Sequence, residues 1–188
     1  MNLRARLVED LQVVRSRDPS VRSLGEALLT PGLRAVWAHR VAHYLNGRGH
    51  RVIARAIAEL SRLGTGIDIH PGAQLGRRVF IDHGCGTVIG ETAVLGDDVS
   101  LYQNVTLGSR GWWCDAPAQR RHPAIGAGSV IGSGASVLGP ITVGANAIVS
   151  AHALVLKDVP GGAHIRGSQQ PSRVRPAAGR GPEIVEHG

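Results

Sequence analysis

The sequence predicts a parallel β-helix, because aliphatic residues recur every six positions between residues 69 and 155. Glycine or another small residue often follows the aliphatic one, which suits a tight corner. An α-helix would repeat every 3.6 residues and a simple strand every two. We therefore expect each hexad to form one flat side of a triangular coil, with its aliphatic side chain stacked in the shaft. The recurring positions are Ile69, Leu75, Ile81, Ile89, Leu95, Leu101, Leu107, Ile125, Ile131, Val137, Val143, Val149 and Val155.

The repeat is interrupted twice. Two extra residues separate Ile81 from Ile89, and a longer break follows Leu107. Leu107 and Ile125 lie three hexads apart, so the longer break does not change the phase. We expect residues 108–123 to form a loop that protrudes from the solenoid, and such loops on rigid scaffolds often carry function.

Residues 1–64 are predicted to form a helical region in front of the β-helix. Apolar residues recur at helical spacing in a stretch that ends at Asp18-Pro19, and again over residues 23–29, 33–45 and 51–63. Four short helices bury little apolar surface alone, so we expect them to pack on the first coils or on a neighbouring subunit. The β-helix is expected over residues 65–167. A Pro-, Gly- and Arg-rich tail, expected to be partly disordered, covers residues 168–188.

Length and composition limit the class of protein. The 188 residues, with 26 Gly and one Phe, suit one solenoid with a slim aliphatic core. No apolar run reaches the roughly 18–20 residues needed to cross a membrane, and the charged N-terminus does not resemble a secretory signal. Cys85 and Cys114 are too few for a disulfide framework. We expect a cytoplasmic protein that does not bind membranes.

The charge balance is basic, with 21 Lys plus Arg against 14 Asp plus Glu. Nucleic acid is not the expected partner, because the sequence has no aromatic platform or basic helix of the usual kind. A phosphate-bearing small ligand is a simpler use of local positive charge, and a compositional bias towards Arg is the other explanation.

Four polar residues in the hexad region indicate a catalytic cluster. They are Asp68, His83, Glu91 and His122. A histidine beside carboxylates can act as a general base, because a carboxylate fixes its tautomer and stabilises the imidazolium. Asp68 and His83 are fifteen residues apart, and about eighteen residues per coil would bring them to nearby positions on successive coils. A solvated aspartate and a surface histidine remain the alternative.

Longer motifs around these residues resemble the bacterial and plant serine O-acetyltransferases over roughly residues 15–165. The motifs are Asp68-Ile-His-Pro, Asp82-His-Gly-Cys-Gly-Thr-Val-Ile-Gly-Glu-Thr-Ala, Asn104-Val-Thr-Leu-Gly and Arg121-His-Pro. The resemblance implies acetyl transfer from acetyl-CoA to the hydroxyl of L-serine, giving O-acetylserine for cysteine synthesis. It also implies a left-handed β-helix, whereas periodicity leaves the hand open and most parallel crossovers are right-handed. Homotrimers, sometimes paired into hexamers, with sites at subunit interfaces, are implied as well.

The resemblance also implies roles for individual residues. His83 would be the general base for direct attack without an acyl-enzyme, and Asp68 would orient it. The implied substrate-binding residues are Asp18, Asp82, Glu91 and Arg121, with Asp18 and Asp82 facing the ammonium group and Arg121 the carboxylate. His122 is also implied to stabilise the oxyanion. CoA would lie in a groove between neighbouring β-helices, near Gly108, Ser133, Gly134, Ala151 and Lys157.

Departures from the family pattern leave some alternatives open. The loop after Gly108 is longer than usual in the family, so another acceptor (homoserine, a sugar or a specialised-metabolism hydroxyl) remains possible. In this loop, Trp112 and Trp113 would form either a stacking platform for adenine or a hydrophobic patch. Gly188 stands where relatives carry the C-terminal Ile that docks into O-acetylserine sulfhydrylase, which argues against that complex. The short N-terminal region argues against a hexamer.

A metal site is not expected. His39 and His43 have the i,i+4 spacing of metal ligands on a helix, but the sequence shows no third ligand beside them.

Overall fold

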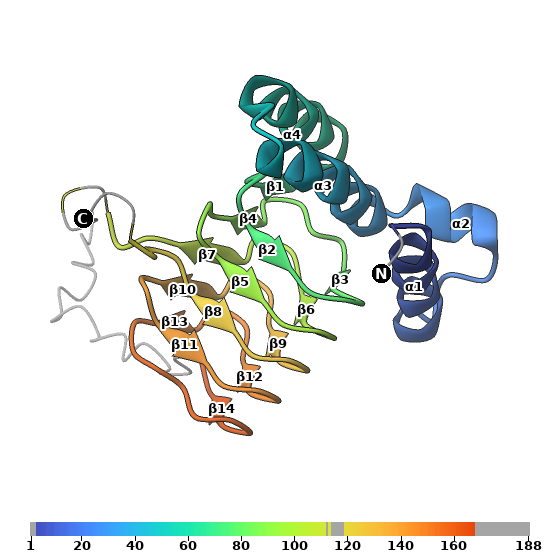
Figure 1. Cartoon of the computed structure of the whole chain (residues 1–188). Coiled ribbons are helices and arrows are strands. Elements are labelled where there is room, and N and C mark those ends of the chain that lie inside the picture. The colour runs from blue at the N-terminus through green and yellow to red at the C-terminus, as the bar shows by residue number, and fades with distance from the viewer. Residues whose placement is uncertain (1–2, 112, 114–118, 168–188) are drawn as a thin grey trace, which may run out of the picture.

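The computed structural model describes residues 3–111, 113 and 119–167, and shows four helices followed by a three-sided parallel β-helix (Figure 1). The helical N-terminal region is confirmed. It consists of α1 (Leu3–Arg17), α2 (Leu24–Leu29), α3 (Pro31–Gly47) and α4 (Arg51–Thr65). Trp112, Cys114 and the tail 168–188 lie outside the described residues, so the predictions made for them stay predictions.

The described strands form three parallel sheets, one for each side of the coil. Sheet A contains β1 (Asp68–Ile69), β4 (Val88–Ile89), β7 (Thr106–Gly108), β10 (Ser136–Leu138) and β13 (Leu154–Val155). Sheet B contains β2 (Gln74–Leu75), β5 (Val94–Leu95), β8 (Ala124–Ile125) and β11 (Thr142–Val143). Sheet C contains β3 (Phe80–Ile81), β6 (Ser100–Leu101), β9 (Val130–Ile131), β12 (Ile148–Val149) and β14 (His164–Ile165).

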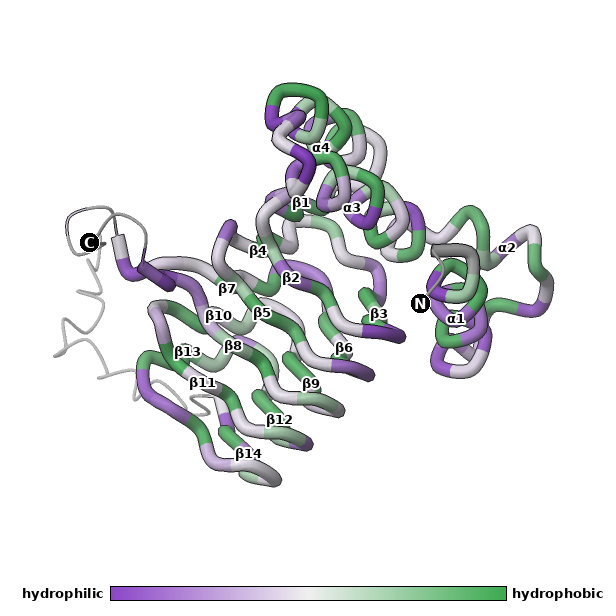
Figure 2. The backbone as a smooth tube through the Cα atoms, viewed as in Figure 1, coloured by the Kyte–Doolittle hydropathy of each residue, from purple (hydrophilic) through white to green (hydrophobic). Residues whose placement is uncertain are grey.

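The predicted hexad positions form the shaft of the β-helix. Every one of the aliphatic residues that define the repeat is buried, and together they belong to one continuous core. In sheet A, for example, Ile69 pairs with Ile89, which pairs with Leu107 on the next coil. Figure 2 shows hydrophobic residues recurring at the strands of successive coils. The parallel β-helix prediction is therefore confirmed, and the arrangement is consistent with the left-handed form.

Coil length varies where the hexad pattern is interrupted. Ile69 and Ile89 are twenty residues apart, because the two extra residues after Ile81 lie in this coil. Leu107 and Val137 are thirty residues apart, because this coil contains the longer break. Each interruption falls at a corner between two sheets. We name the corner between sheets C and A, which carries His83, the His83 corner, and the corner between sheets A and B, which carries His122, the His122 corner.

A second, smaller core fixes the helices on the first coil. Phe80 lies on the outer side of β3 and packs with Val13 of α1, Ala27 of α2 and Leu33 of α3. A buried ion pair joins Arg40 to Asp10, with 2.6 Å between Arg40 Nε and Asp10 Oδ2, and Arg40 Nη2 also donates to the Gly76 carbonyl. Figure 1 shows α1 and α2 beside β3, and α3 and α4 over the start of the β-helix. The end of α1 is thereby held next to the His83 corner.

Candidate active site

The two-residue interruption of the hexad pattern forms a widened turn at the His83 corner. On the second coil, Asn104 is the one described residue of this corner with a positive φ, at 58°. On the first coil, His83 (φ 55°) and Gly84 (φ 78°) are left-handed, in addition to Gly86. A non-glycine residue in this region is uncommon and costs backbone free energy. The strained turn directs the His83 side chain into solvent, where it is 75% exposed.

His83 lines a pocket of about 270 Å³ together with Asp82 and Asp18. Its Nε2 lies 3.9 Å from Asp82 Oδ1. The Ser20 hydroxyl and backbone N–H both donate to Asp18 Oδ1, at 2.6 and 2.9 Å. These hydrogen bonds, with a smaller contribution from His83, hold the pKa of Asp18 below its ordinary value. The pocket therefore presents a carboxylate to a cationic group and an accessible imidazole beside it.

Arg17 anchors the end of α1 that supplies Asp18. Its Nη1 donates to the Ser100 hydroxyl at 2.8 Å and to the Asp98 carbonyl at 3.1 Å, and its Nη2 lies 3.2 Å from Asp98 Oδ1. Hydrogen bonding from Arg78, the largest cause, keeps the pKa of Asp98 below its ordinary value, so Asp98 remains a charged acceptor for Arg17. The residue after this anchor is Asp18.

The His122 corner is built differently, because Thr92 clamps its histidine. The Thr92 hydroxyl accepts from the backbone N–H groups of Arg121 and His122, at 3.0 and 3.1 Å. The backbone N–H of Thr92 donates to His122 Nδ1 at 3.1 Å, and the hydroxyl lies 2.8 Å from the same atom. A β-carbon at Gly90 would lie 2.1 Å from His122 Nε2. The His122 ring therefore occupies space that only glycine leaves open.

The clamp determines the tautomer of His122. A backbone N–H can only donate, so Nδ1 of His122 must accept. A neutral imidazole then carries its proton on Nε2. The residue is 8% exposed, so the orientation of its side chain is set by packing as well as by hydrogen bonds. A fixed, buried N–H donor suits stabilisation of a developing oxyanion.

Arg121 lies beside His122 and forms an ion pair with Glu91, with 2.5 Å between Arg121 Nη2 and Glu91 Oε2. Both residues line a pocket of about 450 Å³. Residues 108–123 contain the longer break of the repeat, and we call them the long excursion. Two arginines attach its two ends to later coils: Arg110 donates to the Leu156 carbonyl, and Arg120 donates to the Pro140 carbonyl at 2.7 Å.

Within one chain, the predicted site residues divide between the two corners at opposite ends of the sheet A strands. Asp18, Asp82 and His83 lie at the His83 corner, and Glu91, Arg121 and His122 lie at the His122 corner. Asp68 lies on β1 between them and pairs with Val88; in the described part of the chain no hydrogen bond joins it to His83. The predicted CoA residues divide in the same way: Ser133, Gly134 and Ala151 follow strands of sheet C, and Gly108 and Lys157 lie at the C-terminal ends of sheet A strands.

Sequence reasoning missed Gly90, Thr92 and Arg17 as residues that support the site. Gly90 and Thr92 lie within the motif that singled out Glu91, and Arg17 precedes Asp18. A small residue after a hexad aliphatic is expected at any corner, so the pattern did not distinguish Gly90.

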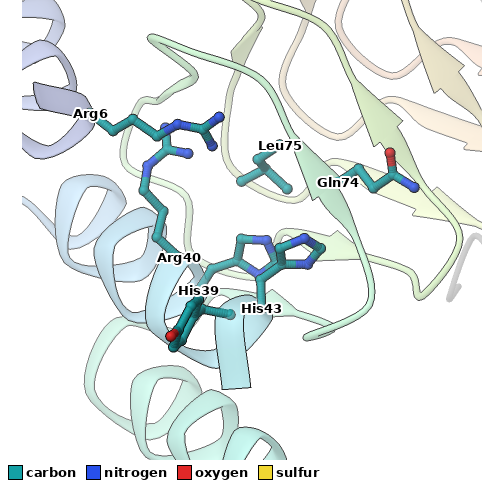
Figure 3. A pocket seen from close by; sticks show the side chains of 7 residues that line it. Arg6, His39, Arg40, His43, Gln74 and Leu75 are labelled. Atoms are coloured by element: carbon teal, nitrogen blue, oxygen red, sulfur yellow. The ribbon is translucent and has the colours of Figure 1, made fainter. Parts of the chain in front are cut away.

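A further pocket, of about 580 Å³, lies between α1, α3 and β2 and contains His39 and His43 (Figure 3). The ring centroids are 5.5 Å apart. His43 Nδ1 lies 2.9 Å from the Pro71 carbonyl and must donate to it. Among the described residues, no three His, Cys, Asp or Glu side chains form a group able to hold a metal ion. None of the helices that the structure describes has the length and apolar character needed to span a membrane.

Comparison with curated proteins gives close relatives. The chain is 47% identical over 184 residues to the serine acetyltransferase of Mycobacterium tuberculosis, covering 94% of this chain and 79% of the relative. It is 52% identical over 155 residues to the serine acetyltransferase of Bacillus licheniformis, covering 82% of this chain and 70% of the relative. No protein-family model matches the chain.

Comparison with solved structures gives proteins of the same name. Serine acetyltransferase isoform 3 of Entamoeba histolytica, in complex with cysteine, has a TM-score of 0.84 at 38% identity, covering 91% of this chain. The Neisseria gonorrhoeae enzyme in complex with serine has a TM-score of 0.81 at 36% identity and 88% coverage. The Brucella abortus enzyme in complex with coenzyme A has a TM-score of 0.79 at 40% identity and 84% coverage. The chain spans 60%, 67% and 62% of these three solved chains.

Proposed function

Because the chain belongs to the serine acetyltransferase family, we propose that it transfers the acetyl group of acetyl-CoA to the hydroxyl of L-serine. The product is O-acetyl-L-serine, an intermediate of cysteine biosynthesis. The observation that carries the proposal is the accessible His83 imidazole in one pocket with two carboxylates. The relatives of the chain are named serine acetyltransferases. Solved neighbours in complex with serine and with coenzyme A support both substrates.

In the proposed mechanism, His83 removes the proton of the serine hydroxyl as its oxygen attacks the thioester carbonyl. The exposed ring can accept this proton because no described hydrogen bond occupies either ring nitrogen. Asp82, 3.9 Å away, stabilises the imidazolium that forms. His83 then returns the proton to the departing CoA sulfur. Asp18, held ionised by Ser20, would face the substrate ammonium, and Asp68 would support the base from sheet A.

The His122 corner would stabilise two negative charges, that of the oxyanion and that of the substrate carboxylate. The clamped Nε2–H of His122 suits the oxyanion of the tetrahedral intermediate. Arg121 would bind the substrate carboxylate, for which a guanidinium is a bidentate donor. Glu91 already pairs with Arg121 and so sets the position of the guanidinium.

A site that needs both corners would be completed between neighbouring copies, and we propose a homotrimer for this reason. The two corners lie at opposite ends of the strands of sheet A. The test mixes His83→Ala with His122→Ala after joint refolding. If each site combines His83 of one copy with His122 of another, random mixing restores about a quarter of the wild-type sites. Mixtures no more active than the separate variants would contradict a shared site. The expectations against a hexamer and against a sulfhydrylase complex, and that of a cytoplasmic location, stay predictions.

The experiment that tests the function is release of the CoA thiol from acetyl-CoA with a panel of acceptors. The panel contains L-serine, D-serine, L-homoserine, L-threonine and simple sugars. Saturable turnover dominated by L-serine is expected. Preference for another acceptor would contradict L-serine as the substrate, and the long excursion, with Trp113 73% exposed, would be the first segment to mutate.

A further inference from the structure

A small polar pocket, distinct from the two that carry the proposed chemistry, lies where the α3–α4 connection meets the first coil. Its volume is about 200 Å³, below the range typical of sites for larger organic ligands. The lining residues are Asn46, Arg51, Arg55, His70, Pro71 and Glu91. The proposed mechanism uses only Glu91 of this set, so it leaves the remaining polar groups unassigned.

The pocket combines two arginines from one face of α4. Arg51 and Arg55 are four residues apart and therefore neighbours on the helix surface. The ion pairs found among the described residues include neither of them, whereas Arg40, Arg62, Arg77 and Arg78 each have a carboxylate partner. Two guanidinium groups with no ion-pair partner among the described residues create a local positive potential.

His70 adds a neutral hydrogen-bond donor. The backbone N–H of Gly72 donates to His70 Nδ1 at 2.9 Å, so the neutral ring carries its proton on Nε2. Burial, with a smaller contribution from Arg55, keeps the pKa of His70 below its ordinary value. The ring is therefore a neutral Nε2–H donor near pH 7, and the Asn46 amide is a second neutral group with N–H donors.

Glu91 is the one acidic residue that lines the pocket, and Arg121 compensates its charge from the other side. The balance of the pocket is thus two unpaired cations and two neutral donors. We propose that this pocket binds a small tetrahedral oxyanion of the sulfate or phosphate class, held by Arg51, Arg55, His70 and Asn46. Guanidinium groups suit such anions because they donate two parallel hydrogen bonds.

Binding of an anion here affects the neighbouring pocket through Glu91, which lines both. A bound dianion repels the Glu91 carboxylate and strengthens its pairing with Arg121. Arg121 is then less available for a substrate carboxylate, so the anion raises KM for L-serine. This consequence rests on the proposed function, whereas the binding site itself does not.

The binding test measures the heat of titration of the purified full chain with sodium sulfate and, separately, sodium phosphate, each against sodium chloride at equal ionic strength. Wild-type protein is expected to bind one of the two oxyanions saturably. Arg51→Gln and Arg55→Gln are expected to weaken binding by about tenfold each. Arg48→Gln is the matched control, because Arg48 stacks on the Tyr44 ring outside the pocket and its loss changes the net charge equally.

Two results would overturn the site: equal heats with chloride, or equal weakening by Arg48→Gln. Either would mean general screening of a basic surface. The kinetic test compares KM for L-serine with and without the anion, in wild-type protein and in Arg55→Gln. A rise of KM in wild-type protein alone supports the link through Glu91, and an equal rise in both disproves it. Should the chain lack acetyltransferase activity, the proposed function fails while the titration still decides the anion site.

Discussion

The two corners that border sheet A hold their histidines in opposite ways. At the His83 corner, a strained backbone turn presents a side chain that is 75% exposed, and the nearest carboxylate oxygen with which it pairs lies 3.9 Å away. At the His122 corner, Thr92 and the space left by Gly90 hold a histidine residue that is 8% exposed. The first ring is accessible to solvent, and the neutral form of the second is restricted to one tautomer.

This difference matches the two tasks of acyl transfer. A general base must gain and lose a proton in each turnover, so its ring nitrogen must be accessible. A donor to an oxyanion must be fixed before the charge develops, because reorganisation during the reaction raises the barrier. The comparison therefore supports the proposal that the exposed histidine is the base and the clamped one the oxyanion donor.

The largest effect is expected at the exposed histidine. His83→Ala should lower kcat by about 10²–10⁴-fold, the usual contribution of a general base. The exposed side chain contributes little packing, so the melting temperature should stay within a few degrees of wild type. Steady-state release of CoA thiol and a thermal melt together check this. Retention of a tenth or more of wild-type kcat would contradict the proposal that His83 is the base.

A smaller effect is expected when the clamp is removed. Thr92→Val removes the hydroxyl that binds two backbone N–H groups and contacts His122 Nδ1. Loss of an entire oxyanion donor costs about 10²–10³-fold in kcat, so a displaced donor should cost about tenfold. Thr92→Ser keeps the hydroxyl and is expected to restore most of the activity. A change in KM without a change in kcat would show that Thr92 acts on substrate binding instead.

His39 shows what burial does to a histidine without a clamp. It is 4% exposed, and its Nδ1 has no hydrogen-bond partner in the described part of the chain. Burial, the largest cause, lowers the pKa of His39 from 6.5 to about 3. The unfolded chain therefore binds a proton below pH 6.5 that the folded chain does not bind, so stability falls as the pH falls.

The size of this effect follows from linkage. Wild-type protein should lose about 1.4 kcal/mol of unfolding free energy between about pH 7.5 and about pH 5.5 through His39 alone. Urea unfolding at the two pH values checks this against His39→Leu, which should lack that part of the loss. His152→Gln, at an exposed position, serves as the control and should retain it. Equal pH dependence in wild type and His39→Leu would contradict the depressed pKa.

The sequence predicted the repeating features of the fold and failed to predict long-range partners. Hexad spacing identified the shaft residues because each stacks on an equivalent one coil away. The same spacing assumed coils of eighteen residues, whereas the first coil has twenty and carries the widened turn at His83. The contact of Thr92 with His122 crosses the long excursion, and the pairing of Asp10 with Arg40 joins two helices. No local pattern encodes either contact, because both depend on how separate segments pack.

The smallest expected effect is a change in KM for L-serine. It tests the fact that one of the two corners includes a residue from outside the β-helix. The His83 corner takes Asp18 from the end of α1, whereas the residues of the His122 corner belong to the β-helix itself. Arg17→Gln removes an ion pair and two hydrogen bonds that fix this end of α1 on Asp98 and Ser100. Partly exposed pairs contribute about 0.2–1 kcal/mol, so KM for L-serine should rise by about 1.4- to fivefold.

The control for Arg17→Gln is Arg15→Gln, which changes the same charge at an exposed position of the same helix. It should leave KM for L-serine unaltered. KM for acetyl-CoA should not change in either variant, because Asp18 lies at the proposed acceptor pocket. Added salt should raise KM for L-serine less in Arg17→Gln than in wild type, since the pair is already lost. A parallel rise of both KM values would instead indicate that α1 supports the whole β-helix and not the acceptor pocket.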